Sequence, residues 1–329
     1  MTGESEVTVT VCIPTIRSGT VGHAVAAVRR QTYSSWELLV IGQGANEEHL
    51  RLAVEAASGG DPRIEYVHLD RMGASVARNT GIAASNGAII AFTDDDCEPS
   101  PDWLAVIVEC FASDPFLGVV GGAVVPPDEG PRGWLTSVPA IMPSEVRYDP
   151  PTVGGRRPPG CIWIGANVAM RRDIPDLVGP FDECLGPGTT FPGGEDSDFK
   201  HRIEAAGVVT LATPRSTVQH THGVRSGVRA GLRHSRNYAR GNGAMAAKLT
   251  LQGDPFGRQW RSQALRGASG EWRRDIRPHR IPVAVSRRWH FARAYREVLA
   301  KYEAVVGGVL VPSSGADADN LAQMRSGRA

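Results

Sequence analysis

Between residues 7 and 125 the chain alternates short apolar runs, rich in β-branched residues, with longer segments whose apolar residues recur at helical spacing. The short runs predict buried strands and the longer segments predict amphipathic helices. The predicted strands are 7–13, 36–41, 64–69, 88–93 and 118–125, and the predicted helices lie near 21–31, 47–57, 75–85 and 102–111. Strands that alternate with helices are typical of an α/β fold, a mostly parallel sheet flanked by helices.

The pattern changes after residue 125. Nine prolines fall between residues 126 and 160, which predicts a long loop that packs over a site. Beyond it we expect strands at 161–170, 208–212 and 216–220, helices at 224–249 and 287–305, and a disordered tail from residue 312. The expected organisation is a first half 1–125, the proline-rich loop 126–160, a second half of the same domain 161–222, a basic helical extension 223–311 and the tail 312–329.

The composition is that of a soluble globular protein. With 41% hydrophobic and 22% charged residues in 329, the chain is neither collagen-like nor disordered throughout. Its start lacks a signal sequence, and no run reaches the roughly 18 apolar residues of a spanning helix, so we expect a cytoplasmic location. Its five cysteines include no CxxC pair, which disfavours a zinc site or disulfide framework and predicts small core residues.

The near-neutral net charge of +1 hides an uneven distribution. Residues 223–300 carry 17 Lys plus Arg against four acids, and the rest of the chain carries 19 against 31. A basic segment binds phosphates, anionic lipid or nucleic acid, or else it pairs with the acidic body. No recognised nucleic-acid motif accompanies it, so we expect no nucleic-acid partner.

The first candidate site is an apolar strand that ends in three carboxylates, Asp94, Asp95 and Asp96. Open α/β sheets bind ligands at the carboxyl ends of their strands. In an extended chain Asp94 and Asp96 point the same way, and two carboxylates on one face favour Mg²⁺ or Mn²⁺. An Asp-rich turn without a ligand is the alternative.

Two further constellations follow. Glu195, Asp196 and Asp198 open a predicted helix after a pair of glycines, where acids also serve as helix caps. His220 and His222 share one face of a predicted strand, a spacing that suits a metal as well as an ordinary surface.

In this order the chain resembles the inverting nucleotide-sugar glycosyltransferases of family 2, which have the GT-A fold. The matching stretches are Val11-Cys12-Ile13-Pro14-Thr15, Gly73-Ala74-Ser75-Val76-Ala77-Arg78-Asn79-Thr80-Gly81, Phe92-Thr93-Asp94-Asp95-Asp96, Gly165-Ala166-Asn167 with Arg171-Arg172, Gly179-Pro180-Phe181-Asp182-Glu183, Glu195-Asp196-Ser197-Asp198 and His220. The resemblance covers about residues 7–222. It implies a GT-A (Rossmann-like) core, with a donor-binding half and an acceptor half, followed by the basic helical extension.

The resemblance also implies roles for individual residues. Asp96 would ligate the Mn²⁺ or Mg²⁺ that bridges the donor diphosphate, with Asp94 beside the ribose or the same ion and His220 completing the metal shell. Asp196 would be the base that takes the acceptor's proton, and Glu195 would position the acceptor or that base. The implied donor-binding residues are Pro14, Thr15, Arg17, Gln43, Arg78, Asp94 and Asp95. Candidate phosphate or acceptor contacts are Asn167, Asp198, His222, Arg225 and Arg229.

One position departs from the family pattern. After the second predicted strand the family has carboxylates that contact the nucleobase, whereas this chain has Gln43 between two glycines. An amide both donates and accepts hydrogen bonds, so Gln43 can still read a base edge. The departure leaves UDP, dTDP and GDP all open as the nucleotide.

The basic segment contains Arg225, Arg229, Arg233, Arg236 and Arg240, whose spacing of three and four residues forms one stripe on a helix. A stripe of like charges needs anions: the donor diphosphate, a lipid-linked acceptor at the inner membrane face, or the acidic body of the protein. We therefore expect a nucleoside-diphosphate sugar as donor, a saccharide, lipid-linked or small hydroxyl compound as acceptor, and a peripheral membrane contact.

Two other functions compete with this interpretation. A nucleotidyltransferase also uses an α/β sheet, carboxylates and Mg²⁺, but the segment after Pro14 makes a poor phosphate loop. A non-catalytic protein that binds lipid or nucleic acid through the basic segment has no use for Asp94, Asp96, Glu195 and Asp196 together.

Overall fold

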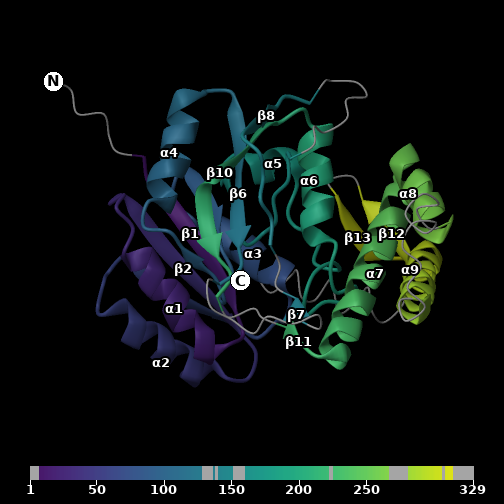
Figure 1. Cartoon of the computed structure of the whole chain (residues 1–329), viewed down its shortest axis with the longest axis horizontal. Helices are drawn as coiled ribbons and strands as arrows, with labels where there is room; N and C mark the ends of the chain where they lie inside the picture. Colours follow the sequence, from purple (N-terminus) through teal and green to yellow (C-terminus); the bar gives the residue numbers. More distant parts are fainter. Residues whose placement is uncertain are drawn as a thin grey trace. The chain divides into compact units, whose positions relative to one another are not determined.

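The computed structural model describes residues 7–127, 136–137, 140–150, 160–221, 225–266, 281–305 and 308–313 (Figure 1). The chain divides into two units, Met1–Val178 with Lys200–Gly227, and Gly179–Phe199 with Val228–Ala329. The division differs from the expected boundaries, because residues 179–199 group with the C-terminal segment and not with the remainder of 161–222.

The first unit is built on a sheet that has nine strands among the described residues, in the order β3-β2-β1-β4-β9-β6-β10-β5, with β8 paired to β10. Its strands are β1 (Val9–Thr15), β2 (Trp36–Gln43), β3 (Ile64–Leu69), β4 (Ile89–Phe92), β5 (Glu98–Pro99), β6 (Leu117–Val125), β8 (Val146–Tyr148), β9 (Val168–Arg171) and β10 (Val209–Gln219). Strands β3, β2, β1 and β4 run parallel, β6 and β10 are also parallel, and β9 is antiparallel between β4 and β6. The predicted α/β fold with a mostly parallel sheet is confirmed.

Helices cover both faces of this sheet. They are α1 (Ser18–Arg29), α2 (Glu47–Ser58), α3 (Ala74–Ala84), α4 (Trp103–Ser113), α5 (Ile174–Val178) and α6 (Glu195–Ala205), of which α6 begins in the second unit. Val11 of β1 packs in one core with side chains of α1, α2 and α4. Its neighbour Cys12 faces the other side, where a Cβ on Gly81 of α3 would lie 2.8 Å from its Sγ. Burial on both faces accounts for the uninterrupted apolar runs of these strands.

Three local predictions are corrected. The strands expected at 208–212 and 216–220 are one strand, β10, whose pairing with β6 shifts register between Ala212 and Thr217. The strand expected at 161–170 is confined to β9. The loop expected at 126–160 contains β7 (Thr136–Ser137) and β8, and β8 pairs with β10 because Val146 and Tyr148 alternate with a polar residue. Residues 128–135, 138–139 and 151–159 of that loop lie outside the described part.

The described residues of the second unit include three long helices and a hairpin. They are α7 (Val228–Leu251), α8 (Pro255–Arg266), α9 (Ile281–Lys301), β12 (Tyr302–Val305) and β13 (Val309–Pro312). Residues of α7 and α9 share a core with Leu185 and Phe191 from the segment before α6. The helix expected at 287–305 ends early, because β12 pairs with the β-branched strand β13 instead of continuing α9. Residues 314–329 of the expected tail are outside the described residues. Among the helices described, none is both long and apolar enough to cross a bilayer.

Candidate active site

The carboxyl ends of β1 and β4 lie side by side, because the two strands are parallel neighbours. The acidic segment after β4 therefore meets the residues that follow β1. Thr15 donates a hydrogen bond of 2.7 Å from its Oγ1 to Asp95 Oδ2, and the guanidinium of Arg17 pairs with both oxygens of the same carboxylate. Arg17 Nη1 also lies 2.8 Å from Asp96 Oδ2. The sequence stretches around Pro14 and around Asp95 thus form one site.

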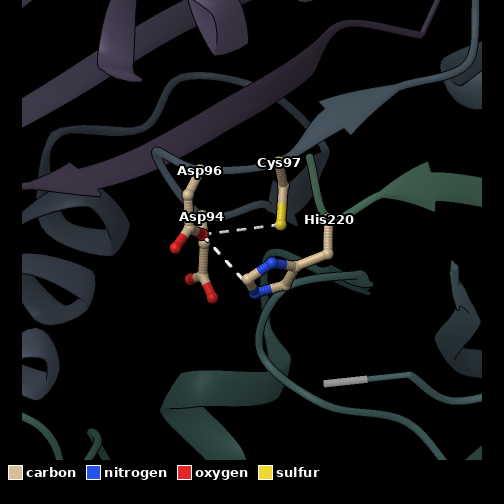
Figure 2. Close-up of side chains that lie close together, drawn as sticks. All are labelled: Asp94, Asp96, Cys97 and His220. Atoms are coloured by element: carbon tan, nitrogen blue, oxygen red, sulfur yellow. Dashed lines mark hydrogen bonds and ion pairs between the residues drawn. The ribbon is translucent and has the colours of Figure 1, made fainter. Parts of the chain in front are cut away.

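His220 joins this site from the far end of the sheet. It follows β10 directly, and β10 pairs antiparallel with β5, whose Glu98 stands two residues after Asp96. This pairing places His220 Nε2 3.6 Å from Asp96 Oδ1. Figure 2 shows the side chains of Asp94, Asp96, Cys97 and His220 turned toward one another, and one ligand atom from each lies within 4.8 Å of all the others.

This cluster has the chemistry of a site for a hard divalent cation. Two carboxylates and an imidazole are donors that suit Mn²⁺ and Mg²⁺. Asp96 and His220 are both buried, so the fold holds their donor atoms in place. We conclude that Asp94, Asp96 and His220, the three residues expected to bind the metal, are near enough to share one ion.

Cys97 is the member of the cluster that sequence reasoning assigned only to the core. Burial, together with the carboxylates of Asp94 and Asp96, raises the pKa of its thiol well above the ordinary value. A protonated thiol is a weak metal ligand, and Cys97 Sγ instead lies 3.8 Å from Asp96 Oδ1, which it can approach as a donor. Its position directly after Asp96 was the only feature of the sequence that could have indicated its place in this cluster.

Two arginines bring positive charge to the acidic segment. Arg78 of α3 is buried, and its Nη2 lies 3.5 Å from Asp94 Oδ1. Burial lowers the pKa of Arg17, but the negative charges of Asp95 and Asp96 raise it by more, so the net change is upward. Burial raises the pKa of Asp95, and the pairing with Arg17 and Thr15 opposes that rise. The side chain of Arg17 remains 47% exposed, although its guanidinium contacts both carboxylates.

Two residues that were expected to contact a ligand, Gln43 and Asn167, instead form hydrogen bonds within the protein. Gln43, at the end of β2, is buried and donates from Nε2 to the carbonyls of Arg71 and Gly73 at 2.6 and 3.1 Å. Asn167 is also buried, donates from Nδ2 to the carbonyls of Ala123 and Ser216, and accepts a bond of 2.9 Å from Trp103 Nε1. The donors of both amides therefore hold backbone segments together.

The expected catalytic acids lie in the second unit, on the first turn of α6. Glu195 and Asp198 are buried, and Asp196 between them is partly exposed. The turn is entered through Gly193 and Gly194, whose φ angles of 123° and 87° are in the region that favours glycine. Asp198 Oδ1 lies 2.6 Å from Nζ of Lys248, a residue that sequence reasoning did not single out.

The arginine stripe is corrected at its first member. Helix α7 begins at Val228, so Arg225 lies on β11 (Arg225–Ser226), which pairs with β7, and only the later four arginines lie on the helix. Arg229, Arg233 and Arg236 are exposed, and none of them forms an ion pair with another described residue. His222 lies outside the described residues.

The α7 stripe continues onto α9. Burial, and then the charges of Arg236, Arg240 and Arg293, lower the pKa of His290. Arg293 also stacks over Trp289, with its guanidinium carbon 5.3 Å from the ring centroid. We call the surface formed by Arg229, Arg233, Arg236, Arg240, Trp289, His290 and Arg293 the basic face.

Comparisons with known proteins bear on this site. The Haloferax volcanii protein named glucosyl-dolichyl phosphate glucuronosyltransferase is 28% identical over 186 residues, which is 55% of this chain and 57% of the relative. The glycosyltransferase AglE of the same organism is 30% identical over 195 residues, 56% of this chain and 58% of that protein. The chain therefore matches under three-fifths of the length of either relative.

Solved structures share the fold at low sequence identity. The mannosyltransferase PcManGT from Pyrobaculum calidifontis, in complex with GDP-Man and Mn²⁺, has a TM-score of 0.52 at 16% identity, covering 98% of this chain and 80% of that one. S. aureus TarS 1–349 with UDP-GlcNAc has a TM-score of 0.58 at 13% identity, covering 88% of this chain and 81% of that one. These matches support the GT-A architecture. The model of the family described as glycosyl transferase family 2 matches residues 10–175, half of the chain, and the chain belongs to that family.

Proposed function

We propose that the chain is a metal-dependent, inverting glycosyltransferase that moves a sugar from a nucleoside-diphosphate sugar to an acceptor hydroxyl. The observation that carries this proposal is the convergence of Asp94, Asp96 and His220 at the carboxyl edge of the sheet. Family membership adds to it and favours sugar transfer over the nucleotidyltransferase alternative. A cation held there would act as a Lewis acid on the leaving diphosphate.

The residues around the cluster have separate tasks. Arg17, whose side chain is 47% exposed, offers its guanidinium to a phosphate oxygen while it stays paired with Asp95. Arg78 holds Asp94, and Thr15 holds Asp95, so the carboxylates keep their orientation when a donor enters. Positive groups aimed at a leaving diphosphate stabilise the charge that develops in the transition state.

Asp196 is the proposed base. Inversion by direct displacement requires one carboxylate to take the proton of the acceptor hydroxyl as the oxygen attacks. Asp196 is partly exposed on the first turn of α6, whereas Asp198 is buried and engaged with Lys248. Glu195, beside Asp196, orients the acceptor or the base.

Nucleotide binding tests the donor site. UDP, dTDP and GDP are each added with and without Mn²⁺ to the wild type, to Asp96→Ala and to the control Asp149→Ala, which removes an exposed carboxylate. We expect one diphosphate to raise Tm only with Mn²⁺, with Asp96→Ala losing the effect and Asp149→Ala keeping it. No response from the folded wild type to any of the three would overturn the proposal.

The acceptor, we propose, is lipid-linked and met at an anionic membrane surface. The name of the Haloferax volcanii relative specifies a dolichyl phosphate acceptor, and the basic face offers exposed arginines beside an exposed tryptophan. Such a face suits a peripheral contact with anionic lipid. Cosedimentation with vesicles of phosphatidylcholine, with and without phosphatidylglycerol, tests this.

The vesicle experiment has a clear expected pattern. Binding should need phosphatidylglycerol, weaken with added salt, and fall in the triple variant Arg229→Glu, Arg233→Glu, Arg236→Glu. The matched control reverses the exposed Arg51 of α2, which lies off the basic face. Equal binding by the triple variant and the wild type would reject the membrane contact but leave the transferase reaction standing.

A further inference from the structure

Helix α7 carries a single lysine in an apolar stretch, and that lysine is completely buried. Lys248 has 0% of its side chain exposed, and its Nζ lies 2.8 Å from Asp182 Oδ2 and 2.6 Å from Asp198 Oδ1. It also donates to the carbonyl of Gly308, in the turn between β12 and β13. The ammonium group therefore hydrogen-bonds Asp182 and Gly308 and forms an ion pair with Asp198, which brings three separate segments of the second unit together.

The arrangement is costly as a source of stability. Two buried carboxylates share one cation, which leaves the group with excess negative charge if both are ionised. Burial raises the pKa of Asp182, an effect that Lys248 opposes and Asp198 reinforces. Asp182 is further held by the backbone N–H groups of Cys184 and Leu310, at 3.0 and 2.9 Å. Replacing a buried ionic group by apolar residues is often neutral or stabilising, so stability alone does not account for this one.

The location of Asp198 suggests what the group does. Asp198 stands on the first turn of α6, two residues after Asp196 and three after Glu195, and its N–H bonds the carbonyl of Gly194 at 2.9 Å. Fixing the Asp198 carboxylate therefore fixes the turn that carries the proposed base.

A second contact between α7 and this turn is made by backbone alone. A Cβ on Gly241 of α7 would overlap the carbonyl group of Gly193, and one on Gly194 would lie 3.0 Å from the carbonyl of Gly241. Helix α7 thus contacts the acidic turn at two places, through Gly241 before the turn and through Lys248 within it.

We propose that Lys248 is a positioning residue that clamps the acidic turn of α6 onto α7 and so sets the orientation of Asp196. It acts through Asp198, while Asp182 and Gly308 hold the ammonium group in place. The C-terminal segment is then part of the catalytic apparatus. This inference rests on the proposed role of Asp196.

A double-mutant cycle tests the clamp. The variants are Lys248→Met, Asp198→Asn and the two combined, assayed as release of nucleoside diphosphate from the UDP-, dTDP- or GDP-sugar that the nucleotide panel selects. We expect Lys248→Met to lower kcat about 100-fold, the loss typical of a reacting group displaced by about 1 Å. The Kd for the nucleoside diphosphate with Mn²⁺ should stay unchanged, because the metal cluster belongs to the first unit.

The combined variant separates positioning from folding. Removing the Asp198 charge relieves the unpaired carboxylate and should restore part of the Tm lost in Lys248→Met, yet kcat should stay as low as in that variant. Recovery of kcat together with Tm, or a kcat loss equal to the product of the two single losses, would overturn the clamp.

Gly241→Ala supplies a test that leaves every charge in place. Its methyl group displaces Gly193 and should lower kcat without changing the Kd for the nucleoside diphosphate. The matched control is Gly231→Ala in the same helix, where nothing lies within 4 Å of the added atom. If Lys248→Met does not fold, the comparison of Gly241→Ala with Gly231→Ala is the test of the clamp. Equal kcat in these two variants overturns the inference.

Asp196→Asn distinguishes failure of the inference from failure of the proposed function. If that variant keeps its kcat, Asp196 is not the base and the positioning role falls with it. If Asp196→Asn is inactive while Lys248→Met and Gly241→Ala turn over normally, the base assignment stands and only the clamp is rejected.

Discussion

Removing the charge of Arg17 should change the affinities for Mn²⁺ and for a nucleoside diphosphate in opposite directions. Its guanidinium pairs with Asp95 and lies 2.8 Å from Asp96 Oδ2, so it neutralises the carboxylates that would hold a metal ion. A divalent cation on the same carboxylate is repelled by this positive charge. Arg17→Met should therefore tighten the binding of Mn²⁺ alone, even though it weakens the binding of a nucleoside diphosphate.

The magnitude follows from the distances. A cation bound to Asp96 at about 2.1 Å lies within roughly 7 Å of the guanidinium. Repulsion between a divalent and a monovalent charge at that distance is about 5 kcal/mol at an effective dielectric constant of 20 and about 1 kcal/mol in water. Because the Arg17 side chain is 47% exposed, the lower end applies, and we expect Mn²⁺ to bind about 10-fold more tightly.

The pH of the assay matters because Asp95 loses its charged partner and keeps only the hydrogen bond from Thr15. Burial raises the pKa of Asp95 and Arg17 opposes that rise, so the variant carries a still higher pKa at this carboxyl. The gain in Mn²⁺ affinity depends on an ionised Asp95, so it should be larger at higher pH than at lower pH. As the pH falls through the raised pKa, Asp95 takes up a proton, and the loss of its negative charge cancels the gain.

Isothermal titration of Mn²⁺ into the nucleotide-free protein at about pH 8 and at lower pH measures the effect. The control Arg51→Met removes the same charge from the exposed surface of α2. Mn²⁺ affinity in Arg17→Met that is unchanged or weaker at about pH 8 would refute the placement of the ion on Asp96.

Three further predictions concern Gly122, His290 and Cys97. Gly122→Ala should lower the free energy of unfolding by about 3 kcal/mol, because the added Cβ would overlap Asn167 Nδ2 and the carbonyl of Ser216. A variant Tm equal to that of the wild type would contradict this. The pKa of His290, followed by NMR, should lie below its ordinary value and rise toward it with added salt as Arg236, Arg240 and Arg293 are screened; a salt-independent pKa would leave burial as the only cause. Cys97 should resist thiol reagents in the folded protein and react in denaturant, since burial raises its pKa; rapid labelling of the native protein at Cys97 would show that the cluster is open.

The fold was predictable because its signals are local. The runs that became β1, β2 and β4 are apolar at successive positions, as expected for strands covered on both faces, and acids directly after β4 indicate the edge of a parallel sheet. The candidate carboxylates Asp94 and Asp96 are visible in the sequence for the same reason, because they follow β4 directly. Strand β8 was missed because the surrounding prolines dominate its short alternation, and only the pairing with β10 determines it.

The contacts that complete the site depend on tertiary structure and could not be predicted. Nothing in the sequence places Arg17 on Asp95 and Asp96, which are 78 and 79 residues further along the chain, or shows that Asn167 holds three backbone and side-chain groups. Lys248 did leave a signal, since one lysine inside an otherwise apolar helical stretch implies a buried partner. Its partners, at positions 182 and 198, were identifiable only in the fold.

The second unit explains why the acidic turn and the C-terminal segment cannot be treated as separate parts. Leu185 and Phe191, which precede the turn, are buried against Met245, Phe291 and Val298. A chain that ended after residue 227 would expose those two side chains and leave Asp182 and Asp198 without their cation. Each loss alone amounts to a few kcal/mol, and together they are comparable to the whole stability of a small domain. The turn that carries the proposed base therefore requires α7 and α9 in order to fold.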